Sequence, residues 1–212
     1  MGRPGPVLLI HGIDDTEALF QRIRPCIERS GRVVQCLNLS PNNGAAALDV
    51  LARQVDRFVQ TTFGDREPID VVAFSMGGLV ARYYVQRLGG IARTKRLITI
   101  SSPHKGTFTA YLRGNEGARQ MRPGSAFLRD LNGDARVLQG IEFTSIWTPF
   151  DLMIVPAYSS VLPIGRAIRV SVIAHPLMVG SRRVLKLVLD QLNAEHEALS
   201  PSPKSEISRL ST

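Results

Sequence analysis

The stretch 69–84 constrains the fold more than any other part of the chain. It begins with an apolar, β-branched run over 69–74, which predicts a buried strand, and its apolar residues then recur at helical spacing. The chain must therefore turn sharply at Ser75. Small residues, Ala73 and Gly77, stand two positions before and after this serine, where a closely approaching strand and helix leave no room for larger side chains.

A serine at the apex of such a turn is held in a strained conformation, with its hydroxyl exposed above the sheet. The amide of Met76 would then lie at a helix N-terminus, where the helix dipole and free N–H groups favour an oxyanion. The pattern Ala-x-Ser-x-Gly is typical of a nucleophile elbow in which alanine replaces the first glycine. It predicts that Ser75 is a nucleophile and that the Met76 amide is one donor of an oxyanion hole.

Strand-like runs alternate with helical patterns along the rest of the chain, which indicates βαβ units. We expect strands at 6–10, 33–39, 69–74, 96–101, 141–147 and 168–174. The sequence therefore predicts an α/β fold with a doubly wound, mostly parallel six-stranded sheet flanked by helices. We expect one domain over residues 1–199, with a short flap at about 104–135 instead of a large cap, and a disordered polar tail at 200–212.

Candidates for the base and the acid that a serine nucleophile requires follow other strands. In a doubly wound sheet the site lies beyond the carboxyl ends of the strands. His175 directly follows the last expected strand, and Asp151 follows the one before it. The order Ser, Asp, His along the chain is the order that nucleophile-elbow enzymes use. Asp130 and Asp134 are alternative acids, but they precede a strand.

The loop at 11–13, directly after the first strand, predicts the second oxyanion donor. Gly12 lets the backbone approach a substrate, and the amide of Ile13 can point inward. Asp14 and Glu17 have capping-box spacing and predict the start of the first helix. A carboxylate beside the oxyanion hole would oppose the developing charge, and helix capping would turn it away.

These segments together resemble the α/β-hydrolase superfamily, and most of all its small bacterial triacylglycerol lipases and esterases. The run 73–78, Ala-Phe-Ser-Met-Gly-Gly, is similar to the elbow of the minimal lipases, apart from Phe74, where relatives have histidine. The run 7–13 resembles their oxyanion strand, and 151–155 resembles the segment that bears their acid. The run 102–107, Ser-Pro-His-Lys-Gly-Thr, resembles the segment that opens the lid region in larger members.

The resemblance implies a serine carboxylester hydrolase that acts on lipid-like substrates through an acyl-enzyme, with catalytic Ser75, His175 and Asp151. It implies no metal and no organic cofactor. One alternative keeps the same triad in an acyltransferase or a thioesterase. Another is a degenerate hydrolase that serves as a lipid-binding module.

Candidates for substrate contacts lie close to the proposed catalytic residues in the sequence. Phe74, Leu152 and Met153 are apolar and could line an acyl pocket. His104 opens the flap and is a candidate for a further substrate contact.

The formal net charge of +8 requires a partner or a solvated basic surface. We expect no nucleic acid, because the basic residues are scattered and no recognition signature accompanies them. Basic and apolar residues interleaved in the flap suit peripheral contact with an anionic membrane. A strand-like run that begins at Val7 leaves no room for a signal peptide, and the two cysteines fit a reducing compartment, so we expect a cytoplasmic monomer.

Overall fold

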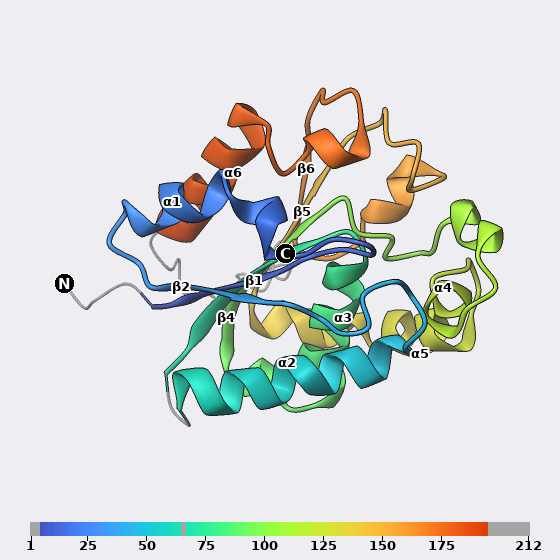
Figure 1. Ribbon diagram of the computed structural model, residues 1–212, viewed down its shortest axis with the longest axis horizontal. Helices are drawn as coiled ribbons and strands as arrows, with labels where there is room; N and C mark the ends of the chain where they lie inside the picture. Colours follow the sequence, from blue (N-terminus) through green and yellow to red (C-terminus); the bar gives the residue numbers. More distant parts are fainter. Residues whose placement is uncertain (1–4, 65–66, 195–212) are drawn as a thin grey trace, which may run out of the picture.

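Six parallel strands form the centre of the molecule (Figure 1). The structure is a computed structural model that describes residues 5–64 and 67–194, so the predicted tail at 200–212 lies outside the described residues. The strands are β1 (Val7–Ile10), β2 (Val34–Leu37), β3 (Ile69–Phe74), β4 (Thr94–Ile100), β5 (Glu142–Trp147) and β6 (Arg166–Arg169). Their order is β2-β1-β3-β4-β5-β6, and all five pairings are parallel, which confirms the predicted fold class.

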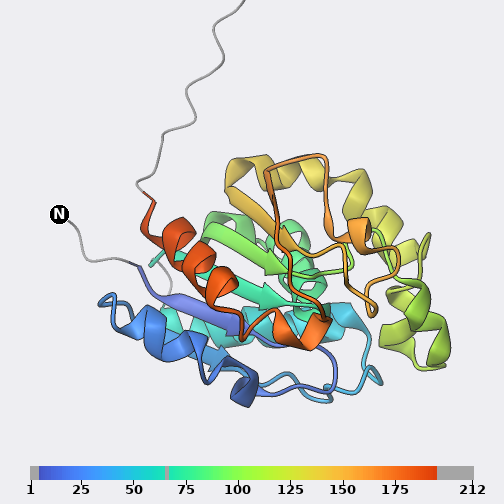
Figure 2. The same cartoon turned by 90° about the horizontal axis from the view of Figure 1, so that it is seen from above.

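Helices cover both faces of this sheet (Figures 1 and 2). The helices are α1 (Ile23–Glu28), α2 (Leu48–Phe63), α3 (Met76–Arg87), α4 (Glu116–Gln120), α5 (Ala126–Gly133) and α6 (Arg182–Asn193). In Figure 1, α1 and α6 lie side by side above the sheet, and α2, α3 and α5 lie below it. Short 3-10 turns join them: η1 (Glu17–Phe20), η2 (Gly90–Ala92), η3 (Phe108–Leu112), η4 (Ala135–Gly140), η5 (Ala157–Ser160) and η6 (His175–Leu177).

Strands buried on both faces explain why the sequence shows apolar runs without polar alternation. In β1, Leu8 and Ile10 pack into the layer of α2 and α3, whereas Val7 and Leu9 pack into the layer of α1 and α6. Successive side chains of a strand point to opposite faces, so every position of a central strand enters a core. Each of these four side chains is fully buried.

The segment after β1 differs from the predicted helix. Thr16, not Asp14, caps it, because the Thr16 hydroxyl accepts a hydrogen bond from the amide of Ala18. Only the turn η1 forms there, and the chain restarts as α1. Pro25 lies in the first turn of α1, where no intrahelical N–H is needed, so it does not kink the helix.

The last strand is shorter than predicted and ends earlier. The prediction placed it at 168–174, but β6 ends at Arg169. It pairs only with β5, which ends at Trp147, and the amide of Val170 donates the last hydrogen bond, to Trp147. Beyond that bond, no strand in the described residues pairs with this segment, so His175 follows in η6 and not directly at the strand end.

The predicted flap, 104–135, is a folded segment that contains η3, α4 and α5. The amide of Gly117 donates to Gly44 (2.8 Å) and that of Phe108 to Val155 (2.8 Å). The fully buried guanidinium of Arg82 in α3 donates to the carbonyl of Leu131 (2.9 Å). Burial lowers the pKa of Arg82 to about 9, which leaves it charged at neutral pH. The flap is therefore hydrogen-bonded to α3, the helix that follows Ser75.

Two further sequence-based expectations concern the cellular setting. Within the described ranges, no helix combines the length and the apolar character that a membrane crossing requires. Cys26 and Cys36 are both free and partly buried.

Candidate active site

Ser75 lies in a strained turn between β3 and α3. Its φ of 53° falls in the left-handed region, which side chains rarely adopt. Glycine follows at 77 and 78 because neighbouring elements come too close for a side chain. A Cβ on Gly77 would overlap the carbonyl oxygen of His11, and one on Gly78 would overlap the hydroxyl of Ser102. The end of β1 therefore requires the small residue at 77.

A chain of two hydrogen bonds joins the three predicted catalytic side chains. His175 Nε2 lies 2.9 Å from Ser75 Oγ, and His175 Nδ1 lies 2.8 Å from Asp151 Oδ2. All three residues are buried, although they come from the elbow, the loop after β5 and the turn η6. If Nδ1–H donates to the carboxylate, Nε2 is free to accept the serine proton, which is the arrangement that nucleophilic catalysis by serine requires.

The carboxylate of Asp151 is held by its own loop as well as by His175. Its Oδ1 accepts hydrogen bonds from the amides of Ile154 (2.8 Å) and Met153 (3.0 Å). Burial acts to raise the pKa of Asp151, but the hydrogen bond and charge of His175 and these two amides outweigh burial and hold the pKa below its usual value. This carboxyl therefore stays ionised at neutral pH.

The lowered pKa of Asp151 predicts a pH-dependent contribution to stability. A carboxyl whose pKa is depressed by folding stabilises the protein above its unfolded pKa of about 3.9, and this stabilisation is lost as pH falls through the folded value. We expect the free energy of unfolding to fall more steeply below about pH 4 in the wild type than in Asp151→Asn. Urea unfolding at a series of pH values measures this, and parallel curves for the two proteins would contradict the assignment.

Phe74 is not among the residues that line the cavity beside Ser75. Its ring packs against His175, with ring centroids 4.7 Å apart, and its side chain is buried in the layer of α1 and α6. Because residue 74 is phenylalanine and not histidine, an apolar ring packs against His175, the candidate base.

Two hydrogen bonds made by the ring of His11 order the loop 11–13. His11 Nε2 accepts from the amide of Leu39 (3.0 Å), so Nδ1 carries the proton and donates to the carbonyl of Gly12 (2.8 Å). A Cβ on Gly12 would lie 3.0 Å from Ser75 Cβ, which shows how closely this loop approaches the serine. Ile13 lies beside Ser75 in a shared cavity.

The two acidic residues after this loop have separate surroundings. Asp14 has a φ of 59°, and its carboxylate forms an ion pair with Arg113 of the flap. Asp15 is half-buried, and its Oδ2 lies 3.0 Å from the position that a Cβ on Gly12 would take. Burial is the main cause of the raised pKa of Asp15. Of these two acidic residues, Asp15 is therefore the one that lies close to the loop beside Ser75.

An apolar cavity of about 210 Å³ opens beside Ser75, between the loop after β1, the flap and the loop after β5. We refer to it as the Ser75 cavity. Its apolar lining includes Ile13, Pro103, Ala110, Ala118, Met121, Met153 and Ile154. A wider depression of about 610 Å³ lies between η1 and residues 171–181, but none of the three triad side chains lines it. The smaller cavity is the one that a reacting acyl group could enter.

Of the four predicted substrate contacts, only Met153 reaches the Ser75 cavity. Leu152 points into solvent and is 81% exposed. His104 is fully buried, with its Nε2 3.0 Å from the hydroxyl of Thr99. Burial holds the pKa of His104 well below its usual value, so this imidazole is neutral. Its placement fits a core residue that joins β4 to the flap.

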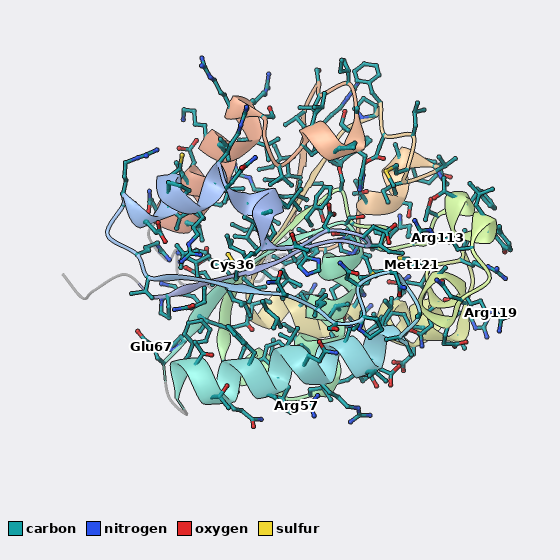
Figure 3. All side chains as sticks on the ribbon, in the orientation of Figure 1. Cys36, Arg57, Glu67, Arg113, Arg119 and Met121 are labelled. Carbon is teal, nitrogen blue, oxygen red and sulfur yellow. The ribbon has the colours of Figure 1, made fainter. Side chains whose placement is uncertain are left out.

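Several residues that line the Ser75 cavity were not predicted from the sequence, because they lie in the flap. Figure 3 shows Met121 and Arg113 at the same end of the molecule, beside α4. The flap has no regular periodicity over 104–125, so its sequence gave no signal for which side chains face inward. In the described part of the chain, no group of three or more His, Cys, Asp or Glu side chains is placed to hold a metal ion.

The all-parallel sheet, the elbow and the loops at its carboxyl edge define an α/β hydrolase, which confirms the predicted superfamily. The sequence profile of the palmitoyl protein thioesterase family matches residues 6–121, more than half of the chain. The chain therefore belongs to this family.

Individual relatives support the same assignment. Palmitoyl-protein thioesterase 3 of Dictyostelium discoideum is 28% identical over 108 residues, which make up 49% of this chain and 37% of that relative. The chain thus spans little more than a third of the length of the curated relative it matches.

Solved structures of lipases share the fold at low sequence identity. The mature lipase BlEst2 of Bacillus licheniformis matches with a TM-score of 0.72 and 15% identity, over 91% of this chain and 93% of that one. Lipase B of Aspergillus fumigatus matches with a TM-score of 0.76 and 17% identity, over 92% of this chain and 55% of that one. At these identities the likeness shows the fold alone.

Proposed function

We propose that the protein is a serine hydrolase that cleaves carboxylic esters of lipid-like acyl groups through an acyl-enzyme. The observation that carries this proposal is the hydrogen-bonded chain Ser75–His175–Asp151 at the edge of an apolar cavity. The strained elbow and the family assignment support it.

The geometry indicates the following course of reaction. Ser75 Oγ attacks the acyl carbonyl carbon while its proton moves to His175 Nε2, and Asp151 stabilises the imidazolium that forms. The amides of Ile13 and Met76 donate to the oxyanion, the second of them from the N-terminus of α3, where amides lack intrahelical acceptors. His175 then returns the proton to the leaving alcohol. Water, deprotonated by the same imidazole, attacks the acyl-serine; the bond between Ser75 Oγ and the acyl carbon breaks, His175 returns the proton to Ser75 Oγ, and the fatty acid leaves.

A thioesterase is the second candidate, and the family assignment favours it. The triad and oxyanion donors would act identically on a thioester. A thiolate leaving group is the anion of an acid with a pKa of about 8.5, so it depends less on protonation by His175 than an alkoxide does. Acyl transfer to an alcohol in place of water would use the same acyl-enzyme.

Matched substrates decide between these reactions. Purified protein is labelled with a fluorophosphonate, and kcat/KM is then measured for an oxygen ester and a thioester with the same acyl chain. We expect labelling and hydrolysis of the oxygen ester, with the thioester preferred if the second candidate is correct. The ratio of ester product to free acid with added alcohol measures transfer. Absence of both labelling and hydrolysis would contradict the proposed function.

Exposed apolar side chains in the two segments that also contribute lining residues to the Ser75 cavity support contact with lipid. They are Phe108, Tyr111 and Leu112 in η3 and Leu152 in the loop after β5, each more than half exposed. Apolar residues clustered in this way are typical of a surface that meets a partner or a membrane. Two flap arginines are partly engaged within the protein, since Arg113 pairs with Asp14, and Arg122 stacks on Tyr111 at 4.7 Å. We therefore propose that the apolar rim contributes more than these two cations.

Replacing Phe108 and Leu152 by serine is expected to weaken binding to phosphatidylglycerol vesicles by tenfold or more. Transfer of one large apolar side chain from water is worth about 1.5–3 kcal/mol, or a factor of about 10 to 150 for each side chain that is fully buried. Neither residue lines the cavity, so hydrolysis of a short soluble ester should stay close to the wild-type rate. Sedimentation with vesicles measures binding.

The matched control replaces Val33 and Val50, which are about half exposed and lie outside the rim. Their loss should leave vesicle binding unchanged. Equal losses in both double variants would show that the rim has no special role. Any charge contribution should weaken with salt, because screening acts over about 10 Å at 0.1 M.

A further inference from the structure

The segment that carries the candidate base, residues 171–181, has few hydrogen bonds to the rest of the protein. Its backbone hydrogen bonds lie in or next to η6 and at the start of α6. Apart from the two bonds of the His175 ring, a single hydrogen bond joins this segment to a distant part of the described chain. The hydroxyl of Thr148 donates it to the carbonyl oxygen of Val172, over 2.6 Å.

Packing holds only part of this segment. Met178 and Val179 are buried in the layer of α1 and α6. The wider depression of about 610 Å³, however, lies along much of the segment. Ile173 and Leu177, on the two sides of His175, line that depression and are more than half exposed. The position of the candidate base therefore depends on the hydrogen bonds that this segment makes.

Thr148 extends the link between β5 and the last part of the chain beyond the end of the sheet. The amide of Val170 donates the last ladder bond, to the carbonyl of Trp147, and Thr148 is the next residue along. Its hydroxyl donates to Val172 and accepts a hydrogen bond from the amide of Phe150 (3.4 Å). A threonine hydroxyl has one proton to donate and lone pairs to accept with, so both functions are used. The side chain is buried, so solvent has little access to replace these bonds.

This hydrogen bond joins the two segments that carry the acid and the base. Asp151 follows Thr148 by three residues, and His175 follows Val172 by three residues. Amides of its own loop already hold the carboxylate of Asp151. The bond to Val172 therefore fixes chiefly the imidazole, which lies 2.8 Å from Asp151 Oδ2 and 2.9 Å from Ser75 Oγ.

We propose that Thr148 is a positioning residue that holds His175 against Asp151. This inference rests on the proposed function, because it concerns the imidazole that would accept the proton of Ser75. The hydroxyl acts through the backbone of Val172 and does not touch the reacting atoms. Thr148 is not among the residues that line the Ser75 cavity, so its loss impairs proton transfer and not substrate binding. A displacement of about 1 Å in a catalytic group lowers a rate by about a hundredfold.

The test removes the hydroxyl and keeps the shape of the side chain. Thr148→Val is expected to lower kcat for p-nitrophenyl butanoate by about ten- to a hundredfold, with KM within about twofold of the wild type. Thr148→Ser keeps a hydroxyl and should hold kcat within about threefold of the wild type. In Thr148→Val, the low-field proton NMR signal of the hydrogen bond between His175 Nδ1 and Asp151 should move upfield or disappear, because that bond lengthens.

The matched control is Thr144→Val, the same substitution at a buried position of β5, before its carboxyl end. The hydroxyl of Thr144 donates to Gln191 (3.3 Å), so this change also removes a hydrogen bond. It should lower the temperature of thermal unfolding but leave kcat and the NMR signal unchanged. A loss of kcat in Thr148→Val no greater than in Thr144→Val would overturn the inference, as would a Thr148→Ser variant as slow as Thr148→Val.

A second pair of variants keeps the test decisive if Thr148→Val does not fold. Thr148→Ala and Thr148→Ser have smaller side chains that differ only in the hydroxyl, and we expect the same difference in kcat between them. Equal kcat values in this pair would contradict the positioning role while ester hydrolysis itself persists. Failure of the proposed function would instead appear in the wild type, as the absence of both hydrolysis and fluorophosphonate labelling.

Discussion

Replacing Ser75 by alanine is expected to abolish both hydrolysis and labelling by a fluorophosphonate. Ser75 Oγ is the only atom of its side chain that can form the acyl bond, and its 2.9 Å hydrogen bond to His175 provides the route for its proton. Loss of the nucleophile in a serine triad lowers kcat by about 10⁶-fold in the best-studied comparison. Kinetics with octanoate esters and the intact mass after labelling measure the two effects.

The variant should fold, because alanine at 75 meets the same backbone conformation as serine and removes one atom. Ser171→Ala, an exposed serine in the wider depression, is the matched control and should keep full labelling and activity. Residual labelling at one site in Ser75→Ala would show that another residue is the nucleophile.

The elements that carry long periodic signals could be predicted from the sequence. The stretch 69–84 gave β3, the elbow and α3, because its apolar run and the flanking glycines allow few other conformations. The proximity of the three candidate triad side chains could also be predicted, since parallel strands bring their carboxyl ends to one edge of the sheet whatever the loops between them do.

The parts that escaped prediction depend on tertiary contacts. His175 was expected directly after the last strand, but the length of β6 is set by its partner β5, and no local pattern in 168–174 shows where that partner ends. Asp14 was expected to cap a helix, and it pairs instead with Arg113, 99 residues away in the sequence.

The direction of each side chain within the irregular segments likewise could not be predicted from the sequence. Leu152 and Met153 are adjacent and equally apolar, yet one is in solvent and the other lines the cavity, because the amides that hold Asp151 fix the turn between them. Ala118 and Met121 line the same cavity, and their position depends on the packing of α4 against the loop before α2, which no local pattern shows.

The second large effect is expected at Asp151. In Asp151→Asn, an amide replaces the carboxylate that accepts from His175 Nδ1 at 2.8 Å. If the new side chain donates to Nδ1 through its NH₂ group, the ring proton moves to Nε2, which then cannot accept the proton of Ser75. The corresponding change in a serine protease lowers kcat by about 10⁴-fold, and we expect a loss of that order with little change in KM.

Asp130→Asn and Asp134→Asn are the matched controls, because they remove the alternative acids by the same change. Their carboxylates pair with Arg87, at 2.9 Å and 2.6 Å, on the exposed side of the flap. Such partly exposed ion pairs contribute up to about 1 kcal/mol each, so the controls should lose some stability and keep activity within a few-fold of wild type. Steady-state kinetics together with thermal unfolding separates the two effects. A severe loss of kcat at Asp134 with little change at Asp151 would mean that the carboxylate which orients His175 during catalysis is not the one that contacts it in this structure.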